Sequence, residues 1–143
     1  MIIKQISVFV ENKAGRIHEI ASTLAENYIN IRSLTLAETT DYGVLRMIVD
    51  KPEAAMSALK AAGITASVND VAAVEVPDRV GGFAEVMKTI HDCNINVEYM
   101  YAFVEKNHNC AILIFRFDQL ENAVSTLVKA GVSVLKANDV LSL

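Results

Sequence analysis

Apolar residues occupy every second position between residues 6 and 10, which predicts a β-strand with one buried face. After a turn at residues 12–15, apolar residues recur at helical spacing from 17 to 28, as on an amphipathic helix that lies on a sheet. Two further strand-like runs follow at 31–38 and 44–49. The positions that carry the first strand and helix are Ile6, Val8, Val10, Ile17, Ile20, Ala21, Leu24 and Tyr28.

A second helix is marked by acids at its start and by a glycine at its end. Asp50 is predicted at the N-cap, Glu53 follows in the positively polarised first turn, and Gly63 takes the left-handed C′ position. A short strand at 65–68 completes the order βαββαβ. This order predicts a ferredoxin-like α+β fold, in which both helices cover one face of a four-stranded antiparallel sheet.

The whole pattern occurs twice. The turn at residues 12–17 returns at 78–83, and the segment Ile29-Asn30-Ile31 returns as Ile95-Asn96-Val97, both 66 residues later. From Asp50 onward the offset to the second copy is 68 residues. The second copy is predicted to contain a helix with Phe83, Val86, Met87 and Ile90, strands at 97–104, 110–117 and 133–135, and a helix marked by Asp118, Glu121 and Gly131.

A repeat of this length is a small domain rather than a solenoid unit, so we predict two homologous domains, residues 1–70 and 71–143. No stretch rich in proline, glycine or serine separates them. Residues 69–71 must therefore both end the first copy and begin the second. The tripeptide Asn69-Asp70-Val71 is matched at the end of the sequence by Asn138-Asp139-Val140.

Both alternating sets of side chains are apolar in the strands predicted at 97–104 and 110–117. A half-solvated antiparallel sheet carries polar residues on its open face. We therefore predict that the second face is covered by domain packing or dimerisation, with a binding groove or scattered surface residues as alternatives. One side would hold Val97, Tyr99, Tyr101 and Phe103 and the other Met100, Ala102 and Val104, and in the next strand Ala111, Leu113 and Phe115 would oppose Ile112 and Ile114.

Composition narrows the class of protein. Apolar residues make up 52% of the chain, which is too many for disorder, and no apolar run approaches the roughly 18 residues needed to span a bilayer. The net charge of −4 and the lack of a basic cluster argue against nucleic acid as a partner. The first six residues lack signal-peptide features, so we expect a cytoplasmic protein without a membrane partner, in which Cys93 and Cys110 form no structural disulfide.

The repeated turn has the chemistry of a ligand site. Gly15 and Gly81 stand between a strand and a helix, where they allow a ligand to approach the main chain. The amides that follow begin a helix and attract an anion such as a carboxylate. Asn12 and Asp78, just ahead of the glycines, can accept a hydrogen bond from an ammonium group. Turn formation and helix capping alone are the alternative explanation.

The combination of strand, Asn/Asp-Lys/Arg-x-Gly-x turn, helix and Ile-Asn-Ile/Val strand start resembles the ACT domain, a small regulatory module that binds amino acids. The resemblance covers essentially the entire sequence, as two ACT domains. In that family the effector commonly lies between two domains, held by the turn of one and the facing strand of another. The implied ligand contacts are Asn12, Ala14, Gly15, Arg16, Ile17 and Asn30 in the first copy and Asp78, Val80, Gly81, Gly82, Phe83 and Asn96 in the second.

The sequence departs from the family pattern at the turn. Many members carry proline before the glycine, whereas Ala14 and Val80 stand there in this sequence, so each turn loses some preset rigidity. Arg16 adds positive charge for a carboxylate, while Gly82 at the matching position is expected to give closer access to the backbone. Asp78 suits an ammonium group. We therefore predict two chemically unequal sites.

Catalysis and metal binding have little support. His18, His91 and His108 do not recur at matching positions and no nucleophile motif accompanies them, so we predict no catalytic residue. Residues 91–93, with His108 and Cys110, offer metal-binding side chains, but their i, i+2 spacing spreads over different helix faces; we expect no metal and no cofactor. An acylphosphatase would need further glycines around the turn, and an RNA-binding sheet more positive charge.

We therefore expect a non-enzymatic regulatory protein that binds an amino-acid effector at ACT domain interfaces. It is expected to form a homodimer, and an enzyme of amino-acid metabolism is a further partner. The alternative is a protein-interaction or dimerisation module that docks on such an enzyme without binding a ligand.

Overall fold

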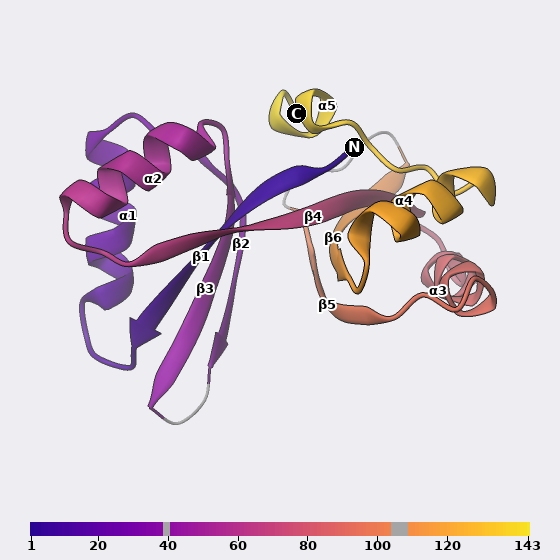
Figure 1. The fold of residues 1–143 in the computed structure, drawn as a ribbon, viewed down its shortest axis with the longest axis horizontal. Coiled ribbons are helices and arrows are strands. Elements are labelled where there is room, and N and C mark those ends of the chain that lie inside the picture. The colour runs from indigo at the N-terminus through magenta and orange to yellow at the C-terminus, as the bar shows by residue number, and fades with distance from the viewer. Residues whose placement is uncertain (39–40, 104–108) are drawn as a thin grey trace. The chain divides into compact units, whose positions relative to one another are not determined.

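The computed structural model describes residues 1–38, 41–103 and 109–143 (Figure 1). Its elements in chain order are β1 (Ile3–Glu11), α1 (Arg16–Glu26), β2 (Ile31–Glu38), β3 (Tyr42–Val49), α2 (Pro52–Ala61), β4 (Ala66–Pro77), α3 (Gly82–Asp92), β5 (Val97–Ala102), β6 (Cys110–Phe117), α4 (Leu120–Lys129) and α5 (Ala137–Leu141). The fold class is α+β, as predicted, and the sheet order is β2-β3-β1-β4-β6-β5.

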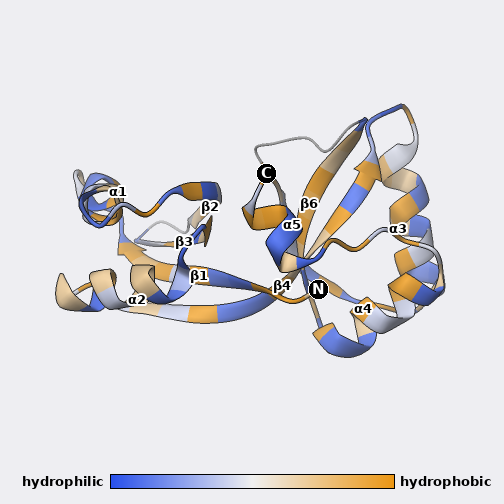
Figure 2. Ribbon diagram, turned by 90° about the horizontal axis from the view of Figure 1, so that it is seen from above, coloured by the Kyte–Doolittle hydropathy of each residue, from blue (hydrophilic) through white to orange (hydrophobic). Residues whose placement is uncertain are grey.

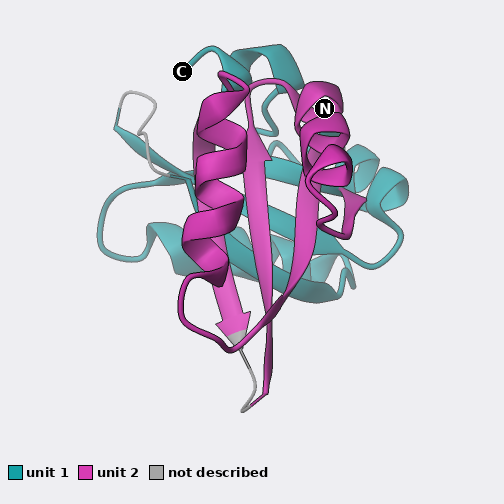
Figure 3. Ribbon diagram, turned by 90° about the vertical axis from the view of Figure 1, so that its left-hand side faces the viewer, with its two compact units in different colours: residues 1–3, 70–143 teal, residues 4–69 magenta. Residues whose placement is uncertain are grey.

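The described residues form two compact units, one of residues 4–69 and one of residues 1–3 and 70–143 (Figure 3). In the unit of residues 4–69, α1 and α2 lie side by side on one face of strands in the order β2-β3-β1-β4. This is the predicted βαββαβ arrangement. The second copy repeats it with strands in the order β5-β6-β4, and Val134 adds an isolated antiparallel bridge to Val74.

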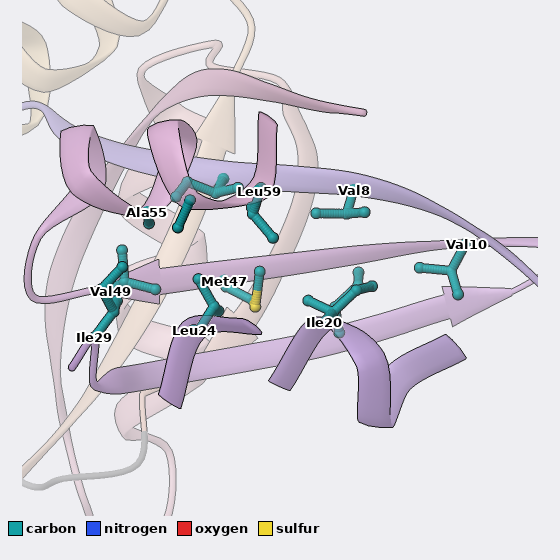
Figure 4. Packing of buried hydrophobic residues seen from close by; sticks show 12 residues of the cluster. Val8, Val10, Ile20, Leu24, Ile29, Met47, Val49, Ala55 and Leu59 are labelled. Atoms are coloured by element: carbon teal, nitrogen blue, oxygen red, sulfur yellow. The ribbon is translucent and has the colours of Figure 1, made fainter. Parts of the chain in front are cut away.

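The core of the unit of residues 4–69 lies between its helices and its sheet. Every second residue of β1 and β3 points toward the helices, and Leu24 and Leu59 approach from α1 and α2 (Figure 4). Burial of each such aliphatic side chain contributes about 1.5–3 kcal/mol. The cluster consists of Ile6, Val8, Val10, Ile20, Leu24, Ile29, Leu45, Met47, Val49, Ala55, Ala58 and Leu59.

The second unit has a core of the same plan with larger side chains. Phe115 and Phe117 of β6 stack with ring centroids 5.1 Å apart, and Ile2 packs against this cluster from the start of the chain. The remaining buried members come from β4, α3, α4 and the last strand segment. They are Ala72, Val74, Val76, Val86, Ile90, Leu120, Ala123, Val124, Leu127 and Val134.

Strand β4 serves both copies. It runs without interruption for 12 residues, and the tripeptide at 69–71 lies inside it. Ala66 packs against the first core, whereas Ala72, Val74 and Val76 belong to the second. As predicted, the end of one copy is directly the beginning of the next.

The matching tripeptide at the end of the sequence folds differently. Asn138, Asp139 and Val140 lie in the short helix α5 rather than in a strand. In the second copy the last strand is reduced to residues 133–135, which bond to β4 through Val134 and its neighbours. The same tripeptide therefore lies in a strand in the first copy and in a helix in the second.

The face of the second sheet away from α3 and α4 is covered, as the double apolar pattern predicts. Ile112 and Ile114 on that face expose only 1% and 0% of their surface. Helix α5 lies on this side of β6, and its Val140 is fully buried (Figure 2). Val104, which the pattern places in the preceding strand, is outside the described residues.

A register shift occurs near the start of β2, between Ile31 and Ser33, and again in β5, between Val97 and Tyr99. Such a bulge takes up one extra residue and reverses the faces beyond it. Val97 lies opposite Phe117 and packs against the core under the helices, while Tyr99 falls on the other face. The prediction that Val97 and Tyr99 share one side is therefore wrong.

Two polar residues of β1 are buried on the face away from the helices. Gln5 and Ser7 expose 0% and 8% of their surface. The Nε2 of Gln5 donates to Ser7 Oγ at 3.2 Å, and this hydroxyl donates to Asn69 Oδ1 at 2.6 Å. The chain of hydrogen bonds offsets the cost of removing these groups from water.

The start of the second helix of each copy differs from the prediction. Lys51, not Asp50, is the N-cap of α2, and Asp50 Oδ1 accepts instead from the amide of Asn30 at 2.9 Å. The carboxylate therefore joins the helix start to β2. Glu53 in the first turn and Gly63 with φ 75° just after the C-cap are as predicted.

Three apolar residues of the helical pattern are more exposed than predicted. Helix α1 ends at Glu26, so Tyr28 lies beyond it in the left-handed region, with φ 57°, and is 85% exposed. Ile17 and Phe83 stand at the starts of α1 and α3 and are 39% and 36% exposed. The middle turns of each helix cover the sheet, whereas these three residues lie at or beyond the helix ends, where no sheet lies beneath them.

Gly82 is required by close packing rather than by its backbone angles. A Cβ at this position would collide with the carbonyl oxygen of Pro77 and approach its carbonyl carbon to 2.9 Å. The expectation that Gly82 gives a ligand closer access is therefore wrong at its Cα, because Pro77 fills that space. In the first copy, the position that matches Gly82 holds Arg16, and the position that matches Pro77 holds Glu11.

Gly82→Ala is expected to destabilise the protein by about 1–3 kcal/mol, because the Pro77 backbone must move to admit the methyl group. The usual preference of helices for alanine over glycine, about 1 kcal/mol, works in the opposite direction and is too small to compensate. Urea unfolding measures the difference, and Arg16→Ala at the matching position is the control, expected within about 0.5 kcal/mol of the wild type. Equal stability of Gly82→Ala and wild type would contradict the packing argument.

Candidate ligand-binding site

The turn before the first helix has nearly the same geometry in both copies. Gly15 and Gly81 are left-handed, with φ 89° and 85°, and each precedes the first residue of its helix. In the first copy the Lys13 amide donates to the Glu11 carbonyl at 2.8 Å; in the second the amide of residue 79 donates to the carbonyl of residue 77 at 2.9 Å. The equivalence of the two turns therefore extends to their hydrogen bonds.

The first helix amides, of Arg16 and Gly82, donate to the carbonyls of Lys13 and Arg79 at 3.4 and 2.9 Å, so the amides that follow them in α1 and α3 are the ones left for an acceptor. Among the described residues, no side chain caps either helix, because a glycine occupies each N-cap. No heavy atom lies within 4 Å of the position that a Cβ would take at Gly15 or Gly81. An open helix N-terminus of this kind attracts a carboxylate through its amides and its dipole.

The charges around the two turns are arranged differently. In the first copy Arg16 Nη1 contacts Glu19 Oε2 at 3.0 Å, and Lys13 Nζ contacts Glu11 Oε2 at 3.0 Å. The hydrogen bond from Lys13 and the positive charges of Lys13 and Arg16 lower the pKa of Glu11.

In the second copy the acid that matches Glu19 is Glu85, and its cation comes from another position. Arg79, which matches Lys13, donates from Nη1 and Nη2 to the two carboxylate oxygens of Glu85 at 2.9 and 2.8 Å. The hydrogen bonds and the charge of Glu85 raise the pKa of Arg79. The cation contributed by position 16 in the first copy is thus contributed by position 79 in the second, where position 82 has no side chain.

A groove lies beside the first helix in each copy. The grooves enclose about 230 Å³ in the first copy and about 280 Å³ in the second. Their linings correspond: Glu19, Gly63 and Thr65 of the first match Glu85, Gly131 and Ser133 of the second. Arg16 lines only the first groove and Cys110 only the second, so the duplicated hollows differ in charge.

The predicted turn contacts lie together at the surface. Asn12, Ala14, Gly15, Arg16 and Ile17 are all exposed. A separate hollow of about 520 Å³ is lined by residues 11–13, 41 and 42, and the Asn12 amide in its wall donates to the carbonyl of residue 41 at 3.1 Å.

The turn of the second copy differs in burial. Asp78, Val80 and Gly81 are exposed, and Val80 is fully so at 101%. Phe83 is at the border of exposure, and Gly82 is buried under the carbonyl of residue 77. Because the Gly82 amide donates to the Arg79 carbonyl at 2.9 Å, the amides of Phe83 and Ala84 are the donors left to a ligand at this turn.

The strand asparagines are not brought to the turn of their own copy. Asn30 and Asn96 are exposed and follow α1 and α3, so an 11-residue helix, about 16 Å long, separates each from its turn. The Asn30 carbonyl accepts from the amide of Asp50, and the Asn96 carbonyl from that of Asp118, both at 3.1 Å. Their side chains are left to face the surface next to the start of the second helix.

Arg32 is a candidate residue that the sequence pattern does not single out. Its Nε and Nη2 atoms are buried without a hydrogen-bond partner. The matching residue in the second copy is Glu98, which pairs with Arg116 at 3.6 Å. Arg32 and Glu98 each lie at the bulge, two residues after the strand asparagine. Sequence periodicity alone does not reveal this bulge, so it does not single out Arg32. An acceptor from a ligand would satisfy the guanidinium of Arg32.

The histidines and cysteines take up separate places. His18 is exposed and its Nε2 lies 3.4 Å from Ser22 Oγ, while His91 is exposed in the last turn of α3. Cys93 and Cys110 are free thiols. Among the residues that the structure describes, no group of three or more His, Cys, Asp or Glu side chains is placed to hold a metal; His108 is outside that part of the chain.

The helices were also compared with the length and apolar character of a membrane span. In residues 1–38, 41–103 and 109–143, no helix has both the length and the apolar character that a membrane span requires.

Comparison with solved structures finds the same fold over nearly the whole chain. Protein BT0572 from Bacteroides thetaiotaomicron is 35% identical, with a TM-score of 0.93 and coverage of 100% of this chain and 98% of that one. The ligand-free regulatory subunit of aspartate kinase from Thermus thermophilus is 16% identical, with a TM-score of 0.63 and coverage of 89% and 91%, a likeness of fold.

Comparison with curated proteins finds no significant match. The family model described as an ACT domain pair, in contrast, matches residues 1–143, the full length of the sequence. The two βαββαβ copies agree with a pair of such domains. The chain therefore belongs to the ACT domain pair family.

Proposed function

We propose that this protein is a non-enzymatic regulator that binds an amino acid as its effector. The observation that carries the proposal is the duplicated left-handed glycine, followed in each copy by helix amides that no described side chain caps. These amides suit the carboxylate of an amino acid, and Asn12 or Asp78 suits its ammonium group. The two ACT domains are taken as residues 1–70 and 71–143.

The effector is proposed to lie at an interface between ACT domains, with the turn of one domain and the strand asparagine of another on either side of it. The separation of about 16 Å between each turn and its own strand asparagine supports this arrangement, since one small ligand does not span it. Residues 12 and 14–17 with Asn30, and residues 78 and 80–83 with Asn96, form the two sets of contacts.

The charges favour the first copy as the site of higher affinity. Arg16 contacts Glu19 through one nitrogen, Nη1, so its other donors remain for a ligand carboxylate. Arg79 already uses both terminal nitrogens on Glu85. Arg32, with two buried nitrogens that lack partners, adds a second donor group for an anion, on the strand side of the first copy only.

Assembly and partners follow from the same regulatory role. A fold neighbour is described as the regulatory subunit of aspartate kinase, which supports an enzyme of amino-acid metabolism as the partner of this protein. We further propose a cytoplasmic location and a homodimer, whose association or orientation responds to the effector. The second candidate function is docking on such an enzyme without an effector, favoured by the exposed apolar side chains of Leu34 and Leu36 in β2.

Isothermal titration against the twenty amino acids is expected to find one or a few that bind at up to millimolar concentration. Asn12→Ala should weaken that binding by about tenfold or more, because it removes an acceptor for the ammonium group. Asp78→Ala is the matched change in the second copy and should have a smaller effect. Absence of heat and of thermal stabilisation for all twenty would refute the effector and leave the docking function.

Arg32→Met is expected to stabilise the ligand-free protein by about 1–3 kcal/mol, because it removes two buried guanidinium nitrogens that lack hydrogen-bond partners. It should also weaken binding of the amino acid found by titration. Arg116→Met is the matched control: this arginine bonds to Glu98 and to the Asp70 carbonyl, so its loss should lower stability. Urea unfolding and titration read the two effects, and unchanged affinity would remove Arg32 from the site.

A further inference from the structure

Helix α4 borders an apolar groove that the proposed ligand site does not use. The groove encloses about 410 Å³, and its apolar lining comes from Met1, Ile2, Val124 and Val128. Val124 is 8% exposed and reaches into the core, whereas Val128 and Met1 remain 41% and 44% exposed. Exposed apolar surface next to a hollow is typical of an interaction site.

The polar side of the groove has a symmetric order of charges. Glu121, Ser125 and Lys129 also line it, at intervals of four residues, so they form one row along α4. The acid and the lysine are about 6 Å before and after Ser125 along the helix axis. Neither takes part in an ion pair among the described residues.

We propose that this face of α4 binds the same face of a second copy of the chain, with the two helices antiparallel and the two-fold axis at Ser125. The row is self-complementary: Glu121 then faces Lys129 of the partner subunit, and the reverse pair forms by symmetry. The small serine allows the helices to approach, and each exposed Val128 covers the other groove. The inference specifies the proposed homodimer and does not depend on the amino-acid effector.

Helix α2 of the first copy lacks the charge row and the exposed valine that α4 carries. At the matching positions α2 has Glu53 and Ser57, but Lys60 replaces Val128 and Ala61 replaces Lys129. Lys60 therefore places a charge where the α4 groove has an apolar side chain. Glu53 would face no lysine on an antiparallel partner helix. The self-complementary face is therefore a property of α4, and α2 supplies a matched control.

Sedimentation velocity over a range of protein concentrations tests the proposal with full-length variants. Val128→Lys, which copies the residue of α2, should raise the dimer dissociation constant about tenfold or more, because it places charge in the apolar contact. Glu121→Lys and Lys129→Glu should each weaken the dimer by bringing like charges together, and the double variant E121K/K129E should return to within about threefold of the wild type. Lys60→Glu on α2 should have no effect.

The double variant also separates association from folding. Glu121 stands in the first turn of α4 and Lys129 in the last, where their charges favour the helix dipole, so the exchange should lower the melting temperature even as it restores the dimer. A structural role alone would make the double variant worse than either single one in both measurements. That result, or a dimer indifferent to all α4 variants, would overturn the surface while sparing the homodimer. A monomeric wild type at about 100 μM would overturn both, whereas the amino-acid titration would stand.

Discussion

One strand that has to complete two cores is the constraint on which the rest of this fold depends. Strand β4 gives Ala66 to the first core and Ala72, Val74 and Val76 to the second, with only a few residues between them. A change of register in one half of the strand would exchange its buried and exposed faces in that half. The shared strand explains why no linker separates the two copies.

The two copies agree where the backbone is demanding and differ where side chains meet the surface. Gly15 and Gly81 keep a left-handed angle that other residues adopt only with strain. At the next position the second copy has Gly82 where the first has Arg16, because the Pro77 carbonyl oxygen occupies the space that a Cβ would need. Small compensated exchanges of this kind alter the charge of a turn while its hydrogen bonds remain the same, which is how one architecture can present two different sites.

The sequence predicts the fold well because period and spacing act locally. The alternation in β1, the helical spacing that buries Leu24 and the glycines that follow α2 and α4 each depend on near neighbours. The errors arise where one residue shifts a frame or where distant atoms decide. The bulge before Tyr99, the Pro77 carbonyl over Gly82 and the unpartnered buried nitrogens of Arg32 depend on three-dimensional contacts, which periodicity does not record. The turn residues and their unequal chemistry are identifiable from the sequence, whereas the pairing of Arg79 with Glu85 and the Pro77 carbonyl over Gly82 are not.

The acid beside each turn decides how a carboxylate ligand has to bind. Glu19 and Glu85 occupy matching positions near a positive helix end, and each already holds an arginine. A ligand that competes for the arginine must break an ion pair, whereas a ligand that binds to the helix amides breaks none. In the second copy the contact is bidentate, so the proposed ligand would bind mainly to the helix amides there; in the first, Arg16 would hold Glu19 and the ligand together. Charge geometry, more than the shape of the turn, therefore separates the two sites.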